Sequence, residues 1–235
     1  MSNIRLFFSE SLSLNFKSKL DKSQSHYLTK VMRIKIGENF SLFNSKAEWL
    51  AKIVEISNGI VGFSVIEKLR QQKVAKEIWL AFSPIKSNYF NFMIQKATEL
   101  GVTKFIPIIF DRTVVRKFNK ERIEKIIIEA TEQSNRINPP ILEKPKNLKN
   151  FLSYNSKNIE LIFADLNSSN KKLELNRTIK PICAIVGPEG DFTESERTLI
   201  LNNKNVKPIN INQNILRAET ATISIISIIS YILSL

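Results

Sequence analysis

Residues 1 to about 70 alternate apolar and polar positions in short stretches, and this period of two residues is typical of half-buried β-strands. The stretches are VMRI (31–34), FSLFN (40–44), EWLAKIVEI (48–56) and IVGFSVIEKL (60–69). Turn-forming residues separate them at Gly37, Asn44 and the pair Asn58 and Gly59. The pattern therefore predicts a small antiparallel β-barrel as a first domain over residues 1–72.

A polar stretch, RQQKVAKE (70–77), is expected to link this domain to a different pattern. Beyond it, apolar runs of strand length alternate with segments of helical period. The expected strands are EIWLAFS (77–83), KFIPIIF (104–110), IELIFAD (159–165), PICAIVG (181–187) and VKPINI (206–211), and the expected helices cover 89–100, 120–136, 194–203 and 218–235. Such alternation predicts an α/β domain over residues 73–235, with a parallel sheet covered by helices on both faces.

Ligands of open parallel sheets bind beyond the carboxyl ends of the strands, where loops and helix N-termini meet. Three loops of this chain follow expected strands, and they are 164–167, 187–190 and 211–217. The middle loop reads GPEG, whose two glycines allow a close approach of backbone to ligand. Thr193 and Glu196 after it have the spacing of a capping box for the next helix. A plain strand-to-helix turn would carry the same residues, so this loop alone does not decide the function.

The segment ILRAET (215–220) places two opposite charges at the start of an otherwise apolar helix. Glu219 suits the positive end of the helix dipole, whereas Arg217 does not. A cation in that position indicates a functional role. The alternative is a structural ion pair of Arg217 with Glu219 or Glu189.

Composition adds a charge argument, because the formal net charge is +13. Surplus Lys and Arg attract polyanions, which favours nucleic acid as the partner. The alternative is a solubilising surface of lysines. The candidate RNA-contacting residues are Arg5, Lys30, Arg33, Arg112, Arg116 and Arg136.

The sequence also excludes several classes of site. Glycines occur only at positions 37, 59, 62, 101, 187 and 190, so neither a phosphate-binding P-loop nor a G-x-G-x-x-G dinucleotide motif is present. A single cysteine, Cys183, and a single histidine, His26, leave no cysteine- or histidine-based metal site or catalytic triad. The start resembles no signal peptide, and the apolar segment 221–235 is too short to span a membrane, so we expect a cytoplasmic protein.

Five segments occur in the order seen in a known family: HYLTKVMRIKIGE, IQKATELGVTKFIPI, ERIEKIIIEATEQSNR, AIVGPEGDFTESE and ILRAET. From about Ile4 to Leu235 the chain resembles the bacterial 16S ribosomal RNA uridine-N3 methyltransferases, the RsmE family of the SPOUT superfamily. The resemblance implies an N-terminal PUA-like β-barrel and a C-terminal α/β domain with a trefoil knot. It also implies S-adenosyl-L-methionine as cofactor, no metal, and a homodimer that acts on 16S rRNA or the small ribosomal subunit.

Carried onto this sequence, the resemblance assigns roles to individual residues. The implied cofactor-binding residues are Ala164, Asp165, Gly187, Pro188, Glu189, Gly190, Asn210, Ile211, Ile215, Leu216 and Thr220. Uracil N3 carries a proton, so the reaction needs a group that accepts it and groups that stabilise the anion on the ring. We hypothesise that Arg217 and Arg136 stabilise this anion and that Glu189 accepts the proton.

Three positions depart from the family pattern, and they keep other functions open. Asp191 replaces a usual glycine, and Asn212 and Asn214 stand where a Gly-x-Arg is usual. One alternative is a non-catalytic ribosome assembly factor that binds rRNA, and another is a knotted methyltransferase acting on another RNA such as tRNA. The serines along the apolar terminal helix leave room for close helix approach, which also favours the homodimer.

Overall fold

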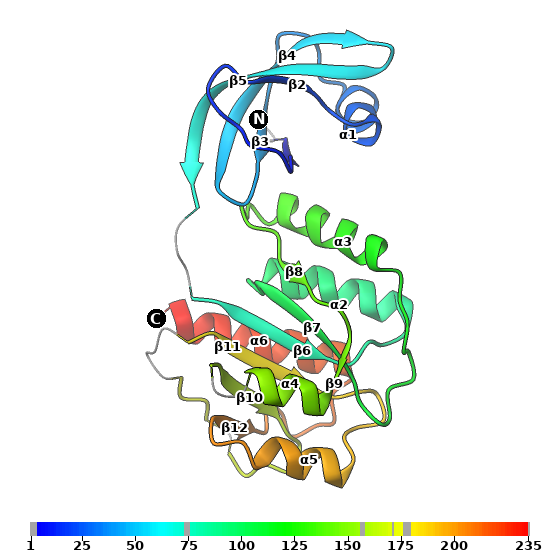
Figure 1. Ribbon diagram of the computed structural model, residues 1–235, viewed down its shortest axis with the longest axis vertical. Helices are drawn as coiled ribbons and strands as arrows, with labels where there is room; N and C mark the ends of the chain where they lie inside the picture. The colour runs from blue at the N-terminus through cyan, green and yellow to red at the C-terminus, as the bar shows by residue number, and fades with distance from the viewer. Residues whose placement is uncertain (1–3, 73–75, 156–157, 171, 176–179, 235) are drawn as a thin grey trace. The chain divides into compact units, whose positions relative to one another are not determined.

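The chain divides into two units (Figure 1). The computed structural model describes residues 4–72, 76–155, 158–170, 172–175 and 180–234. One unit contains Met1–Val74 together with Thr131–Pro139, and the other contains Ala75–Ala130 together with Pro140–Leu235. The sequence pattern puts the domain boundary after residue 72 and gives no sign that the later segment joins the first unit. Part of the expected linker, residues 73–75, lies outside the described residues.

The first unit is built on a five-stranded sheet with the order β1-β3-β4-β5-β2. Its strands are β1 (Arg5–Phe7), β2 (Lys17–Lys19), β3 (Asn39–Phe43), β4 (Ala47–Ser57) and β5 (Ile60–Gln71). The β1 strand runs parallel to β3, and the other pairs are antiparallel. The strands expected at 40–44, 48–56 and 60–69 are therefore confirmed, whereas the two short strands lack a clear period.

Local turn chemistry explains why β3, β4 and β5 pair. Asn58 and Gly59 both have positive φ, 50° and 76°, as a tight turn between β4 and β5 requires. Between β3 and β4, the Asn44 Oδ1 atom accepts hydrogen bonds from the backbone N–H groups of Lys46 and Ala47, at 3.0 and 3.1 Å. These side-chain contacts fix the register that brings the apolar faces of the strands together.

The strand expected at 31–34 is wrong. Only Val31 belongs to a regular element, the turn of π-helix η1 (Tyr27–Val31) that follows α1 (Lys22–His26), and residues 32–34 form neither helix nor strand. The signal of α1 is a helix cap, because Asp21 Oδ1 accepts a hydrogen bond from the Gln24 backbone N–H at 2.8 Å. Val31 is 58% exposed, so the apolar alternation in VMRI does not mark a buried face.

A buried ion pair fastens the returning segment 131–139 within the first unit. Arg5 Nε lies 2.7 Å from Glu48 Oε1, and these two side chains are only 5% and 3% exposed. Arg70 Nε approaches the second carboxylate oxygen of Glu48 at 2.5 Å. The Arg5 guanidinium also donates to the backbone carbonyls of Glu132 and Arg136, at 2.7 and 2.8 Å. Arg5 is therefore buried and occupied, which corrects its assignment to an RNA-contacting surface.

The second unit is an α/β structure whose sheet has the order β12-β10-β11-β6-β7-β8, with β9 beside β7, and every pair is parallel. The strands are β6 (Ile78–Phe82), β7 (Lys104–Ile109), β8 (Ile141–Leu142), β9 (Lys146–Asn147), β10 (Glu160–Ala164), β11 (Ile182–Val186) and β12 (Val206–Ile209). The helices are α2 (Ser87–Glu99), α3 (Lys120–Gln133), α4 (Leu148–Asn155), α5 (Glu194–Leu201) and α6 (Ala218–Ser234). The predicted parallel sheet is confirmed, and α4, β8 and β9 are additions to it.

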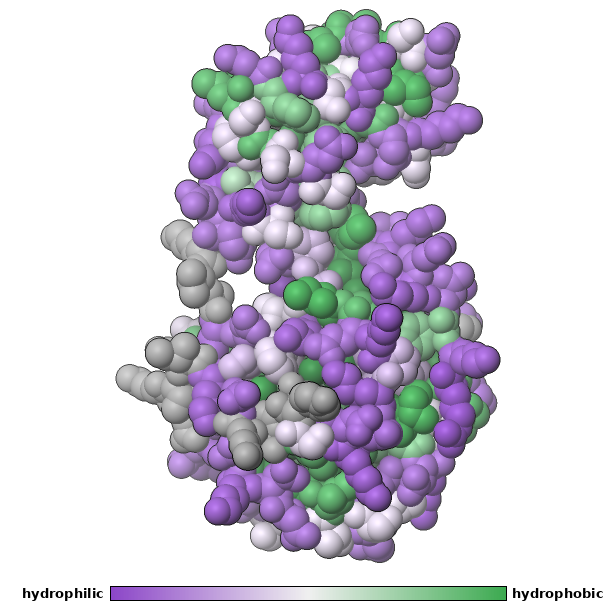
Figure 2. Space-filling model, viewed as in Figure 1, coloured by the Kyte–Doolittle hydropathy of each residue, from purple (hydrophilic) through white to green (hydrophobic). Residues whose placement is uncertain are grey.

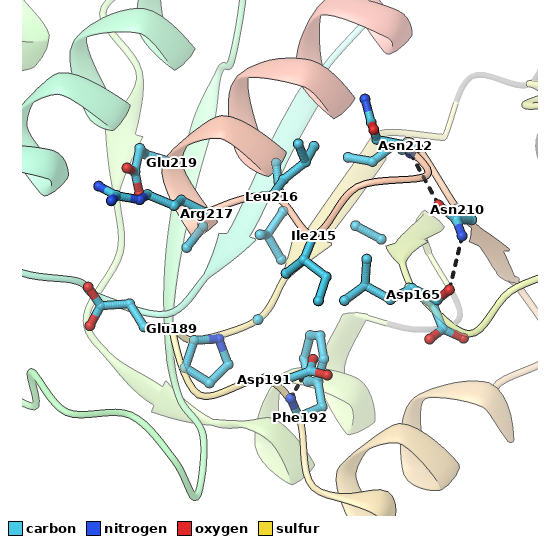
Figure 3. Close-up of a pocket in the computed structure, with 18 of the residues that line it drawn as sticks. Asp165, Glu189, Asp191, Phe192, Asn210, Asn212, Ile215, Leu216, Arg217 and Glu219 are labelled. Atoms are coloured by element: carbon cyan, nitrogen blue, oxygen red, sulfur yellow. Dashed lines mark hydrogen bonds between the residues drawn. The ribbon is translucent and has the colours of Figure 1, made fainter.

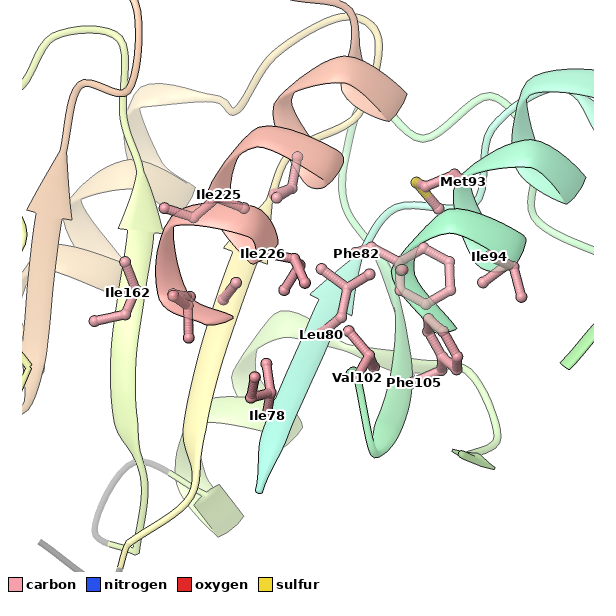
Figure 4. Close-up of a cluster of buried hydrophobic side chains, with 14 of the residues drawn as sticks. Ile78, Leu80, Phe82, Met93, Ile94, Val102, Phe105, Ile162, Ile225 and Ile226 are labelled. Carbon is pink, nitrogen blue, oxygen red and sulfur yellow. The ribbon is translucent and has the colours of Figure 1, made fainter. Parts of the chain in front are cut away.

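Successive side chains of each central strand point to opposite, fully covered faces. Ile78, Leu80 and Phe82 of β6 pack with α2 and α6 on one face (Figure 4). Cys183 and Ile185 of β11 belong to the core on the other face, with α4 and α5 (Figure 1). The expected two-sided cover is thereby confirmed. Because both faces are filled, the open ends of the strands are where a ligand can enter.

The buried pair gives a testable pH dependence. Burial alone would raise the pKa of the Glu48 carboxyl, but the hydrogen bonds and charges of Arg5 and Arg70 outweigh it and hold that pKa below its ordinary value. The resulting stabilisation is complete above the unfolded-state pKa of about 4.3 and is lost as the pH falls through the folded-state value. We expect Glu48→Gln to lower the free energy of unfolding by about 3–5 kcal/mol near neutral pH, because it leaves buried Arg5 unpaired.

Urea unfolding from about pH 3 to about pH 7 measures both effects. The loss of stability in acid should be shallower in Glu48→Gln than in the wild type. Glu55→Gln is the matched control, because Glu55 pairs with Lys19 at 3.4 Å on the exposed surface, and we expect a change within about 1 kcal/mol. Parallel pH curves for the wild type and Glu48→Gln would contradict the assignment.

Candidate functional site

A cavity of about 390 Å³ lies where β10, β11 and β12 end, bounded by the three loops after them and by the start of α6 (Figure 3). These are the three strand ends that the sequence pattern singled out. The predicted residues that line it are Ala164, Asp165, Gly187, Pro188, Glu189, Asn210, Ile211, Ile215, Leu216 and Arg217. Gly190 and Thr220 are not part of its lining.

The lining side chains that sequence reasoning missed include Tyr89, Phe192 and Glu219. Tyr89 comes from α2, far from any of the three loops in the sequence, so only the packing of α2 beside α6 reveals it. Phe192 lies two residues after the end of the GPEG loop. The sequence marked Glu219 as a charge at a helix start, but the direction of its side chain depends on how α6 docks.

The GPEG loop is shaped by an aromatic ring beneath it. A Cβ atom on Gly187 would lie 2.6 Å from a ring carbon of Phe192, closer than packed atoms approach, so the loop needs glycine there. The Phe192 ring packs edge-to-face between Phe110 and Phe163, with ring centres 5.1 and 5.0 Å away. The ring therefore cannot easily give way, and the loop is held against the core.

Asp191 replaces glycine in the loop without changing its turn. It has a φ of 60°, a left-handed conformation that Asp tolerates better than most residues. Its backbone N–H donates to the Pro188 carbonyl at 3.0 Å, and its Oδ1 accepts from the Phe192 N–H at 2.8 Å. The departure at 191 thus preserves the backbone conformation that a glycine would provide.

The loop after β7 braces the loop after β11. Arg112 Nη1 donates to the carbonyl oxygens of Gly190 and Phe192, at 2.9 and 3.4 Å. Thr193 and Glu196 form the predicted capping box, and Glu196 Oε1 also accepts from the Asp111 N–H at 2.8 Å. Arg112, expected to contact RNA, therefore holds the GPEG loop in place.

Asp165 contributes a buried carboxylate that is already occupied. Arg197 Nη2 lies 2.9 Å from its Oδ2, and Arg197 Nε lies 3.2 Å from each of its oxygens. The Asn167 N–H also donates to Oδ1, at 3.1 Å. This pairing, more than any other cause, raises the pKa of Arg197. Asp165 thus holds the loop after β10, and its carboxylate has little capacity left for a ligand.

A chain of asparagines shapes the third loop. Asn210 Nδ2 donates to the Leu166 carbonyl at 3.0 Å, and Asn210 Oδ1 accepts from the Asn212 N–H at 3.1 Å. Asn212 Oδ1 in turn accepts from the Asn214 N–H at 2.8 Å. Asn212 does not adopt positive φ, so side-chain hydrogen bonds, not the left-handed backbone expected from the sequence, let it replace glycine.

Arg217 lies at the exposed edge of the cavity, near Tyr89. Its Nη1 donates to the Tyr89 hydroxyl at 3.5 Å, and its Cζ lies 5.7 Å from the centre of that ring. Arg217 forms no ion pair with either Glu189 or Glu219, both of which the structure describes. The structural ion pair considered as an alternative is therefore absent, and the guanidinium is available to a ligand.

The other catalytic candidate, Arg136, belongs to the first unit. Burial lowers the pKa of its guanidinium to about 10, so it stays charged near neutral pH. The structure thus brings Arg217 and Glu189 to one cavity, whereas Arg136 is held in the segment that Arg5 fastens.

The remaining basic candidates are exposed. Lys30 and Arg33 line a groove on the first unit together with Lys35, and Arg33 adopts a φ of 56°. Arg116 follows β7 and donates to the Asp111 carbonyl at 3.3 Å. These side chains keep the RNA-contacting role as a prediction.

Among the described residues the structure shows no metal site and no reactive cysteine. Their Asp, Glu, His and Cys side chains form no cluster that could hold a metal ion. His26 is exposed, and burial raises the pKa of the Cys183 thiol, which leaves it unreactive. Among the helices that the structure describes, none is both long and apolar enough to cross a membrane.

Comparison with known families assigns both parts of the chain. The family described as an RNA methyltransferase domain matches residues 72–230, and the family described as an RNA methyltransferase PUA domain matches residues 20–63. The PUA-like first domain and the methyltransferase α/β domain implied by the resemblance are thereby confirmed.

Similar proteins cover almost the whole chain. A ribosomal RNA small subunit methyltransferase E of Rickettsia conorii is 36% identical over 227 residues, 95% of this chain and 93% of its own length. Its counterpart in Aquifex aeolicus is 29% identical and covers 96% of this chain and 99% of its own. A solved structure from Legionella pneumophila, in complex with S-adenosylmethionine, is 26% identical with a TM-score of 0.86, covering 99% of this chain and 98% of its own.

The packing beneath Gly187 gives a testable prediction. We expect Gly187→Ala to lower the free energy of unfolding by about 1–3 kcal/mol, because the new methyl group must displace the Phe192 ring. Gly190→Ala is the matched control in the same loop, since its Cβ would lie 3.4 Å from the Arg112 Cβ, and we expect a loss below about 1 kcal/mol. Urea unfolding measures both, and equal losses would contradict the role of Phe192.

Proposed function

The chain belongs to the ribosomal RNA small subunit methyltransferase E family, and on that premise we propose that it methylates N3 of a specific uridine in 16S rRNA, with S-adenosylmethionine as the methyl donor. The observation that carries the proposal is the cavity formed by the loops after β10, β11 and β12. The family resemblance supplies the reaction, and the cavity supplies a site whose shape and chemistry suit it.

The residues of the cavity fit an adenosyl ligand. Its volume of about 390 Å³ is in the range of small-molecule sites. Val186, Ile211 and Leu216 offer apolar surface to a flat base. Gly187 brings backbone close to the cavity without a side chain, so backbone N–H and C=O groups can recognise polar edges of the ligand. These features are the donor set expected for adenosine and do not resemble a phosphate cradle.

When bound, S-adenosylmethionine supplies an electrophilic methyl group on a sulfonium. The residues of the chain then have to orient the uracil and manage its charge. Arg217 stabilises the negative charge that develops on the uracil ring, since its guanidinium is exposed and free of acidic partners. Glu189, exposed at the same end of the cavity (Figure 3), accepts the N3 proton on a carboxylate oxygen. Arg136 remains the second candidate for anion stabilisation.

Basic side chains on both units support RNA as the substrate. Lys30 and Arg33 line a groove of the first unit, and Arg116 is exposed on the second. Figure 2 shows hydrophilic side chains over most of the visible face of each unit. A net charge of +13 would draw such surfaces to the phosphate backbone.

The knotted chain path, the homodimer and the cytoplasmic location belong to the same proposal. The terminal helix supports the dimer: α6 buries Ile225, Ile226 and Ile229 in its own unit. It leaves Ser227 only partly buried, and Tyr231 is exposed. A second copy of the chain would cover this outer side of the helix.

The two rival functions differ from this one in cofactor or substrate. An assembly factor without activity predicts a decayed cavity, yet Asp191, Asn212 and Asn214 each keep the local turn by their own hydrogen bonds. A methyltransferase of another RNA predicts an intact cavity and a different product. The substrate therefore decides between the family function and its second rival.

The deciding experiment is incubation of the purified protein with labelled S-adenosylmethionine and small ribosomal subunits from cells that lack the activity. We expect N3-methyluridine in the 16S rRNA, identified by mass spectrometry of the digested nucleosides. Binding of the cofactor without any product would favour another RNA as substrate. Absence of both binding and product would favour the assembly factor.

Two variants in the same assay test the role of Arg217. Loss of a donor to a developing anion costs about 10²–10³-fold in kcat, so we expect that loss for Arg217→Ala with little change in cofactor affinity. Arg217→Lys keeps the positive charge without the planar guanidinium and should recover part of the lost kcat. Normal kcat in Arg217→Ala would show that the ring anion is stabilised by another residue.

The dimer is tested by sedimentation equilibrium at micromolar concentration. We expect the mass of two chains for the wild type and of one chain for Ser227→Glu, because the added carboxylate would be buried without a partner. Thr198→Glu is the control, since Thr198 is exposed on α5. A wild type that sediments as a monomer would refute the dimer.

A further inference from the structure

One carboxylate of the cavity has no part in the function proposed above. Glu219 lies in the first turn of α6 and lines the cavity. Only 9% of its surface is exposed, and within the described part of the chain no hydrogen bond or ion pair reaches its carboxylate. Figure 3 places Glu219 at the same end of the cavity as Arg217 and Glu189, opposite Asn210 and Asp165.

The Glu219 side chain is largely buried, but its carboxylate oxygens are open to the cavity, so this charge has neither full hydration nor a protein partner in the ligand-free protein. The positive end of the α6 dipole offsets part of the resulting cost. The other acidic residue of the cavity that is largely buried, Asp165, has its carboxylate engaged by Arg197. Glu219 lacks such a partner, so we expect a positively charged hydrogen-bond donor of a ligand to pair with its carboxylate.

We propose that Glu219 binds the α-ammonium group at the amino-acid end of S-adenosylmethionine, an inference that rests on the proposed function. An ammonium group offers both full positive charge and three N–H donors. The sulfonium has charge but no N–H donor, and the ribose hydroxyls have donors but no charge. The uracil arrives from solvent and meets the exposed Arg217 and Glu189, whereas Glu219 is the one buried carboxylate at this end of the cavity, so we assign it to the enclosed ligand.

Calorimetry with three ligands distinguishes a contact to the ammonium from a contact to the sulfonium. S-adenosylmethionine carries both the sulfonium and the ammonium, S-adenosylhomocysteine carries only the ammonium, and methylthioadenosine carries neither. We expect Glu219→Gln to weaken the first two alike, by about 10- to 100-fold, the cost of a lost charge-assisted hydrogen bond. The affinity for methylthioadenosine should change by less than about 3-fold.

Glu194→Gln is the matched control, because Glu194 occupies the first turn of α5, outside the cavity. It should leave all three affinities unchanged. The ligand-free Glu219→Gln protein should also melt at the same temperature as the wild type or higher, since the substitution removes a charge that has no protein partner. A lower melting temperature would reveal a structural partner for the carboxylate and would overturn the inference.

The remaining outcomes are equally distinct. If Glu219→Gln lowered the affinities for S-adenosylhomocysteine and methylthioadenosine equally, Glu219 would contact the adenosine, which would overturn the inference. Weakening of S-adenosylmethionine alone would assign the carboxylate to the sulfonium, with the same consequence. Unchanged binding with slower methyl transfer would make Glu219 the proton acceptor instead. A wild type that binds none of the three ligands would overturn the proposed function itself.

Discussion

The central sheet of the second unit is buried on both faces, and this constraint determines where chemistry can take place. Its strands are all parallel, so β10, β11 and β12 end at one edge. Backbone N–H and C=O groups that have no strand partner at these ends cannot be covered by the helices that fill the two faces. The chain therefore places three consecutive loops and the start of α6 around one cavity, and the residues that hold the loops become as important as those that line it.

Most polar contacts around the cavity are made between loops and leave few groups free. Arg112 holds the carbonyls of the GPEG loop, and Arg197 holds Asp165. Asn210 links the loop after β12 to the loop after β10. With these groups committed, the backbone of the cavity is fixed before a ligand arrives, so little binding energy is needed to order it. Arg217, Glu189 and Glu219 form no ion pair within the described residues, and they are the groups to which we assign the contacts with substrate and cofactor.

The sequence alone predicted the features that depend on short-range chemistry. Hydrophobic period located the long strands and helices, and the spacing of Thr193 and Glu196 located the start of α5, because these signals lie within one element. It failed where the outcome depends on a distant partner. Arg5 reads as a surface cation, and only Glu48, 43 positions away, turns it into a buried one. Likewise no local pattern shows that Tyr89 reaches the cavity.

The first unit is assembled from two separate parts of the chain, because Thr131–Pro139 completes it. The carbonyl groups of Glu132 and Arg136 that receive the Arg5 guanidinium are synthesised more than a hundred residues after Arg5 itself. On a translating ribosome the β-strands of this unit can pair early, but its buried arginine stays without those acceptors until Ala75–Ala130 of the other unit has been made. The N-terminal unit is thus completed only after part of the other unit has been synthesised, although its strands emerge first.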